Sequence, residues 1–360
     1  MEFGLSEEQG LLRESVDRFL DDNADLDRVR KFADDPDDRG DDIWSGLAEL
    51  GVPAILVPEA YGGIGLSALD AAVVAESLGA HATPAPFLST AVLAVAALRL
   101  AGDEAQRGAY LPRIADGSLR IGAAMSELSG ARQDAGVEAR ADGTLHGTAL
   151  FVLDPDADIF LVADRTRRFH LVRADADGVE GTLLPQVDRT RRIAEVAFTG
   201  ASAEALHASD PELALQVIDL GRVIVAADTL GAGQEMLDQA VAYAKQREQF
   251  NRVIASFQAV KHLCAEMAAE IEPSRALVWY AAHALDEVPD EARLMACHAK
   301  AHLAEVGQFV GKTATIVHGG MGFTDLLGLH YWFKRMGFNR QILGGPERVR
   351  EEAARVQGLA

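Results

Sequence analysis

The sequence predicts an α+β fold that is mainly α-helical, and three features of its pattern lead to this prediction. Helical periodicity runs through the first part, strand-like runs separated by Asp, Gly and Pro fill the middle, and long helical stripes return toward the C-terminus. Segregated helices and strands are typical of an α+β protein. We expect an N-terminal helical domain over 1–118, a middle β domain over 119–205 and a C-terminal helical bundle over 206–360.

The first segment is predicted to be helical from its start. Ser6 followed by Glu7 and Glu8 resembles a helix cap and not the basic, then apolar start of a signal peptide, so secretion is not expected. Prolines and glycines between residues 53 and 65 interrupt the helical period. The apolar stretch at 91–100 is too short to span a bilayer, and we interpret it as a buried helix.

The middle segment changes character. Short apolar runs at 150–153, 159–162 and 170–172 are separated by turn-forming residues, which indicates a small β domain. From Pro211 onward, apolar positions recur at steps of three, four and seven, and two or three such stripes in succession predict an antiparallel helical bundle. Pro273 falls inside one of these helices and is expected to kink it.

Composition limits the classes of partner. The 360 residues include 34 Lys and Arg against 55 Asp and Glu, and the formal charge of −21 argues against a nucleic acid or an anionic membrane as a partner. A hydrophobic content of 49% suits a globular protein with a large core. Cys264 and Cys297 are the two cysteines, which fits a reducing compartment and gives neither a disulfide framework nor a zinc site. We therefore expect a cytoplasmic protein without a metal.

Three segments carry a resemblance to a known family. They are VPEAYGGIGLS at 57–67, REQF at 247–250 with SFQ at 256–258, and HGGMGF at 318–323. In this order they resemble the acyl-CoA dehydrogenases, flavoenzymes that place a double bond between the α and β carbons of an acyl-CoA thioester. The resemblance covers nearly the whole chain. It implies N-terminal helices, a central β barrel, a C-terminal four-helix bundle, and assembly into dimers or tetramers.

The resemblance also implies FAD as the cofactor and five residues that hold it. Arg247 and Gln258 would reach across a subunit interface to the pyrophosphate and adenosine end of a neighbour's FAD, with Phe250 supporting the turn between them. A guanidinium suits this task because it stays charged and donates several fixed hydrogen bonds to phosphate. Gly319 and Gly320 would let backbone amides approach the dinucleotide. The alternative is that these residues are only solvated helix ends and a helix C-cap.

Asn251 stands where the family commonly has a turn glycine. Asparagine tolerates the left-handed conformation, so the turn is expected to keep its geometry.

The carboxylate base of the family is missing. Most members carry a glutamate before a Gly-Thr pair near the C-terminus, where this chain has Gly344; a minority carry it in Asp-Leu-Glu-Arg, where this chain has Gly221. Close helix packing is an alternative reason for Gly221. Glu347 and Asp219 are candidates for a displaced base, and Asp219 is the poorer one because a shift of two residues turns a helical side chain to another face. We therefore assign no catalytic residue in this chain.

Other departures affect contacts to the flavin ring and the dinucleotide. Phe151 is interpreted as a strand core residue and not as a flavin platform. The substitutions relative to the family pattern are Ser126, Glu127 and Leu128 for Thr-Glu-Pro; Arg132, Gln133 and Asp134 for Gly-Ser-Asp; Leu153 for a hydroxyl residue; Ile316 for a glutamine; and Met336, after Arg335, for an aspartate.

The losses concern the redox ring and the base, whereas the groups that serve a neighbour's cofactor remain. This pattern resembles the non-catalytic subunit of heteromeric acyl-CoA dehydrogenases of actinobacterial steroid side-chain degradation. It implies an acyl-CoA substrate, a homologous glutamate-bearing partner in a heterotetramer, and an electron-transfer flavoprotein as acceptor. Two alternatives stay open: a self-sufficient homo-oligomer with a displaced base, and a binding or scaffold protein without redox chemistry.

Overall fold

The computed structural model describes residues 4–130 and 135–360. Its internal contacts group the chain into two compact units. The helical unit contains the residues up to Lys31, Ala72–Thr83 and Val223–Ala360, and the sheet unit contains Phe32–Ala71 and Pro84–Arg222. The predicted division into three domains at residues 118 and 205 stays a prediction.

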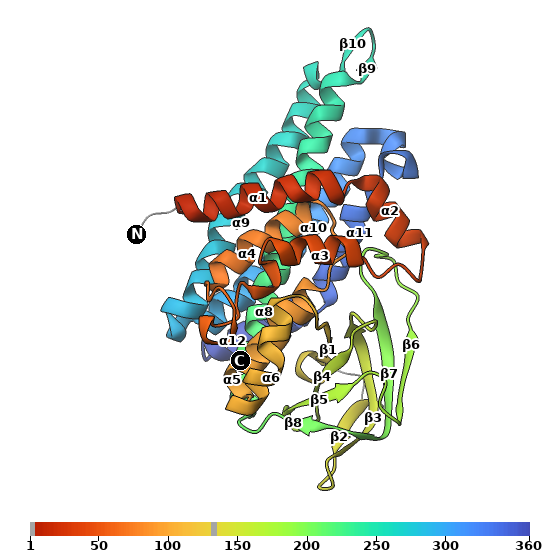
Figure 1. The fold of residues 1–360 in the computed structure, drawn as a ribbon. Helices are drawn as coiled ribbons and strands as arrows, with labels where there is room; N and C mark the ends of the chain where they lie inside the picture. The colour runs from red at the N-terminus through yellow and green to blue at the C-terminus, as the bar shows by residue number, and fades with distance from the viewer. Residues whose placement is uncertain (1–3, 131–134) are drawn as a thin grey trace. The chain divides into compact units, whose positions relative to one another are not determined.

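Helices dominate the described residues, and in chain order the strands of one large sheet come after a first helical stretch and before a second (Figure 1). The predicted mainly helical α+β class is therefore confirmed. The α-helices are α1 (Glu7–Asn23), α2 (Leu26–Asp34), α3 (Asp41–Glu49), α4 (Ala68–Ala80), α5 (Val95–Ala101), α6 (Glu104–Ala115), α7 (Ser126–Ser129), α8 (Pro211–Gln246), α9 (Gln258–Glu287), α10 (Pro289–His318), α11 (His330–Gln341) and α12 (Pro346–Val356).

In the helical unit, α10 packs against α9, α11 and α12, as predicted for a C-terminal bundle. The α9 helix continues through Pro273 without a break.

Two glycines allow α4 and α8 to touch through their backbones. A Cβ on Gly231 would lie 1.8 Å from the carbonyl oxygen of Glu76, and a Cβ on Gly79 would lie 2.0 Å from that of Asp228. No larger residue fits at either position without moving a helix.

The sheet unit is built on eight strands in the order β6-β7-β3-β1-β4-β5-β8, with β2 paired to β3. All three strand-like runs predicted from the sequence lie in this sheet, in β3, β4 and β5. All pairings are antiparallel except that of β1 with β4. The strands are β1 (Ile121–Ala124), β2 (Gly136–Ala139), β3 (Thr144–Leu153), β4 (Ile159–Ala163), β5 (Phe169–Arg173), β6 (Val179–Leu183), β7 (Ile193–Ser202) and β8 (Glu204–Ala205).

The apolar stretch at 91–100 is helical and mostly buried, as predicted, but its first four residues are not in an α-helix. A π-helix, Phe87–Ala94, precedes α5, and all eight of its residues are buried. The Thr90 hydroxyl accepts from the Ile121 amide at 2.9 Å and donates to the Ile121 carbonyl at 3.1 Å, which ties this helix to β1. Among the described residues, no helix is both long enough and apolar enough to cross a membrane.

Candidate functional site

A β-hairpin joins α8 and α9. It consists of β9 (Glu248–Gln249) and β10 (Arg252–Val253) and lies at the tip formed by the end of α8 and the start of α9 (Figure 1). Phe250 and Asn251 form its turn with φ of 55° and 59°. Positive φ at both central residues defines a type I′ turn, whose twist matches that of the flanking strands. The left-handed conformation expected at Asn251 is confirmed.

The predicted cofactor residues of the hairpin face outward. Arg247 and Gln258 are exposed at the two stems, and Phe250 is 87% exposed at the tip. The hairpin is ordered by its own contacts: the Ile254 amide donates to the Arg247 carbonyl at 2.8 Å, and the Phe250 and Phe257 rings meet edge to face at 6.0 Å. An ordered tip with an exposed aromatic ring and guanidinium is suited to binding a second molecule.

The glycine corner after α10 lies beside the end of α8. The His318 ring is 4.7 Å from the Tyr243 ring, which precedes Arg247 by one helical turn. Gly319 has a φ of 60°, and a Cβ on Gly319 or Gly320 would meet no atom within 4 Å. The corner therefore leaves its backbone open to an approaching group, as a dinucleotide contact requires, although a C-cap has the same geometry. Burial lowers the pKa of His318, so its imidazole is neutral at pH 7.

Gly344 lies in the short turn between α11 and α12. Its φ is 106°, and the preceding Leu343 has a φ of 58°. A residue with a Cβ is strained at a φ of 106°. The backbone at Gly344, the position that the resemblance assigns to the family's base, is therefore in a conformation that favours glycine. At the second base position, Gly221 is buried in α8.

Both candidates for a displaced base are engaged in ion pairs. The Glu347 carboxylate accepts from Arg340 at 3.1 Å and is 74% exposed, in the first turn of α12. Asp219 is buried and lies 3.2 Å from the Arg222 guanidinium. Each ion pair engages one carboxylate oxygen, Oε1 of Glu347 and Oδ1 of Asp219, with a guanidinium.

The interpretation of Phe151 as a strand core residue is wrong. Phe151 is 51% exposed and has a φ of 54°, because the register between β3 and β7 shifts between Ala149 and Val152. A β-bulge turns a side chain out of the alternating pattern that sequence analysis assumes. Leu153 is buried.

Of the remaining ring-contact positions, residues 126–128 form part of α7 in the sheet unit. The Ser126 hydroxyl accepts from the Leu150 amide at 3.3 Å, and burial raises the pKa of Glu127. Arg132, Gln133 and Asp134 lie outside the described residues.

A buried ion-pair network in the helical unit was not predicted from the sequence. The Arg335 guanidinium donates to the Asp228 carboxylate at 2.6 and 2.9 Å and to the Thr83 carbonyl at 3.0 Å, and the Asn339 amide donates to Asp228 at 2.6 Å. In the sequence, Arg335 was noted only because Met336 follows it where the family pattern has an aspartate. Its partner lies 107 residues away, and no local signal points to it.

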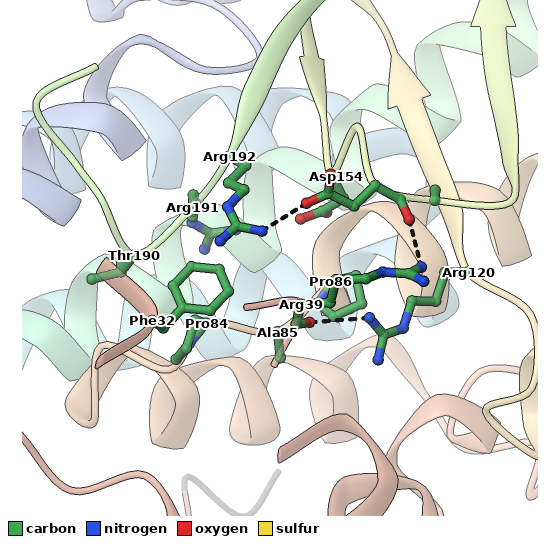
Figure 2. A pocket seen from close by; sticks show the side chains of 12 residues that line it. Phe32, Arg39, Pro84, Ala85, Pro86, Arg120, Asp154, Thr190, Arg191 and Arg192 are labelled. Atoms are coloured by element: carbon green, nitrogen blue, oxygen red, sulfur yellow. Dashed lines mark hydrogen bonds and ion pairs between the residues drawn. The ribbon is translucent and has the colours of Figure 1, made fainter. Parts of the chain in front are cut away.

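A second feature without a sequence prediction is a small pocket in the sheet unit. Four arginines, at positions 39, 120, 191 and 192, lie around Asp154 (Figure 2). Arg192 pairs with Asp156 at 2.8 Å and lies 4.5 Å from the Phe32 ring. The cavity of about 30 Å³ has room for roughly two waters and is too small for a flavin or an acyl group. Within the part of the chain that the structure describes, no group of His, Cys, Asp or Glu is placed to hold a metal ion.

Comparison with known proteins identifies the family. Residues 6–118 match the N-terminal domain of acyl-CoA dehydrogenases, and residues 212–357 match their C-terminal domain. The chain belongs to the acyl-CoA dehydrogenase family.

Proteins similar to this chain include acyl-CoA dehydrogenases and a steroid ACAD. The acyl-CoA dehydrogenase IpdE2 of Mycobacterium tuberculosis is 33% identical, and the match covers 95% of each chain. A solved variant of the steroid ACAD Tcur3481-Tcur3483 is 29% identical with a TM-score of 0.89 over 98% of each chain. The ChsE4-ChsE5 complex of M. tuberculosis contains a chain that is 26% identical with a TM-score of 0.92 over 100% of each chain.

The cofactor prediction has a counterpart among solved structures. An acyl-CoA dehydrogenase from Bacillus anthracis complexed with FAD shares the fold at a TM-score of 0.88 and 21% identity, covering 98% of this chain and 67% of the other. The predictions of an acyl-CoA dehydrogenase and of FAD as the cofactor class are confirmed at the level of the family.

Proposed function

We propose that this chain is the base-lacking subunit of a heteromeric acyl-CoA dehydrogenase, and that it completes the FAD site of a homologous, glutamate-bearing partner. The observation that carries the proposal is the backbone of Gly344, whose φ of 106° favours glycine where the family places its base. Gly221 offers no carboxylate at the second position. Glu347 and Asp219 are engaged with Arg340 and Arg222. One similar structure is a steroid ACAD whose name joins two proteins, and another is a complex of two proteins. Both support a heteromeric assembly.

In this role the hairpin and the glycine corner form the contribution of this chain to the shared FAD site. Arg247 would pair with the pyrophosphate, Gln258 would bind the adenosine end, and Phe250 would hold the turn against the partner. Gly319 and Gly320 would admit the dinucleotide to the backbone. When bound, FAD accepts the hydride from the β carbon, while the partner's glutamate removes the α proton.

The substrate class follows from the family and the relatives. We propose an acyl-CoA thioester with a steroid-derived acyl group, an electron-transfer flavoprotein as acceptor, and the cytoplasm as the site of action. The steroid assignment is supported by the steroid ACAD among the similar structures. Cys264 and Cys297 are not joined in a disulfide, which fits the reducing cytoplasm.

Arg247→Ala tests the interface role of the hairpin. The change removes a charge-assisted contact to phosphate worth about 1.5 to 3 kcal/mol, so FAD affinity of the complex should fall by roughly one to two decades. Folding should be unaffected, because Arg247 is exposed. Flavin retained during dialysis measures the effect. Arg355→Ala, which removes another exposed guanidinium far along the chain in α12, is the matched control. Equal retention by both variants would show that Arg247 does not contact the cofactor.

Phe151 favours one alternative, a self-sufficient homo-oligomer. The family places a ring-stacking aromatic at this position, and Phe151 is half exposed on a left-handed backbone, as a platform for a flavin in the chain's own site would be. This reading requires the chain alone to bind FAD in stoichiometric amount.

A further inference from the structure

The turn between α11 and α12 is held from two sides by charged groups. On the inner side stands Lys300 of α10, which is 1% exposed. Its Nζ donates to the Asn339 carbonyl at 2.7 Å and to the Arg340 carbonyl at 3.0 Å. These carbonyls belong to the last turn of α11, where helical carbonyls lack a partner within the helix. A buried ammonium at this end also complements the helix dipole.

On the outer side, the Arg340 side chain links the helices that flank the turn. It pairs with Glu305 of α10 at 2.8 Å and with Glu347 of α12 at 3.1 Å. Arg350 of α12 also pairs with Glu305, at 3.3 Å. The pairing with Arg340 holds the pKa of Glu305 below its usual range, so this carboxylate stays charged at pH 7. The ends of α11 and α12 are therefore cross-linked through α10.

Between these anchors the chain must reverse within a few residues. The Ile342 amide donates to the Phe338 carbonyl at 3.1 Å, and the Gly344 amide donates to the Gln341 carbonyl at 3.2 Å. Leu343 is buried at 1% exposure in the left-handed conformation, and Gly344 follows with a φ of 106°. Pro346 then begins α12, and its fixed φ suits the first position of a helix. Contacts on both sides therefore fix the path of the chain through the turn, and its backbone strain is concentrated at residues 343 and 344.

We infer that Lys300 and Arg340 are positioning residues that hold this turn in a conformation that only glycine at 344 can adopt without strain. The functional consequence of this inference rests on the proposed role as a base-lacking subunit. In that role, position 344 lacks a carboxylate, and its backbone conformation also disfavours a glutamate. A glutamate introduced at 344 must distort the turn or displace its anchors. The contacts of Lys300 and Arg340, which lie outside position 344, therefore restrict this chain to the role of a base-lacking subunit.

A double-mutant cycle on the full chain tests the inference by thermal unfolding. Gly344→Ala should lower the Tm by about 2 to 6 °C, because it places a Cβ on a strained backbone. Gly337→Ala is the matched control: its Cβ meets nothing within 4 Å on α11, and it should leave the Tm unchanged or raise it by about 1 to 3 °C. In the Lys300→Met background, where the turn can relax, the additional loss from Gly344→Ala should fall to less than half. Lys312→Met, on an exposed position of the same helix, should leave that loss unchanged.

Additive losses in the Lys300→Met background would overturn the inference, because independent sites add and coupled sites do not. If Lys300→Met does not fold, the same cycle with Arg340→Gln decides, with Arg355→Gln as its control for the loss of an exposed ion pair. The cycle needs neither FAD nor a partner. A self-sufficient, flavin-binding chain would therefore refute the proposed function and leave this result intact, whereas additivity would refute the inference and leave the proposed function open.

Discussion

Arg335→Met should lower the free energy of unfolding by about 3 to 5 kcal/mol, the loss typical of a buried ion pair from which one partner is removed. Arg335 and Asp228 are 2% and 3% exposed, and their atoms approach to 2.6 Å. Methionine has a similar length but leaves the Asp228 carboxylate buried without its guanidinium. Urea unfolding followed by far-ultraviolet circular dichroism measures the change.

The control for Arg335→Met is Arg355→Met in α12. Arg355 pairs with Glu351, but both side chains are more than half exposed, at 62% and 57%. Exposed pairs contribute about 0 to 1 kcal/mol, so this variant should unfold close to the parent. Losses of similar size in the two variants would mean that the Asp228 to Arg335 pair does not stabilise the helical unit.

The second large effect concerns the base. In the complex, replacing the partner's glutamate with glutamine should lower turnover by about 10² to 10⁴, the usual contribution of a positioned general base. Gly344→Glu and Gly221→Glu in this chain, assayed alone, should give neither dehydrogenation nor exchange of the α proton with solvent. At 344 the φ of 106° strains a glutamate. We also expect no bound flavin to accept the hydride, because Leu153, Leu128 and Ile316 replace residues to which the resemblance assigns contacts with the ring and the dinucleotide.

The assay for the glutamate variants combines deuterium incorporation at the α carbon with reduction of an artificial electron acceptor. The unmodified chain with its partner serves as the positive control and should be fully active. Dehydrogenation by either variant alone would mean that this chain binds FAD in its own site, and the self-sufficient alternative would replace the proposed role.

Local features of the fold could be predicted from the sequence because their causes are local. The Ser6 cap is one example: its hydroxyl accepts from the Gln9 amide at 3.1 Å, and the Gln9 side chain accepts from the Ser6 amide at 3.0 Å. The αL geometry of Asn251 is another. Each of these two features depends on residues that lie close to each other in the sequence.

Features that depend on distant partners were not predictable. Phe151 fits a strand pattern, and only its pairing with β7 creates the bulge that exposes it. That a base is missing at Gly344 could be predicted from the sequence by resemblance. The conformation of that position could not, because it is set by Lys300, which lies 44 residues earlier in the chain (344 − 300). Likewise, Arg335 gives no sign in the sequence that it pairs with Asp228.

We propose that this chain needs a glutamate-bearing partner to hold FAD at a working site. The flavin absorbance per chain and the acyl-CoA turnover are to be measured for the homogeneous single chain and for the same chain co-expressed with a homologue that carries the glutamate. We expect a colourless or weakly yellow, inactive single chain and a complex that co-purifies with FAD and turns over an acyl-CoA. Stoichiometric flavin together with turnover by the single chain would contradict it.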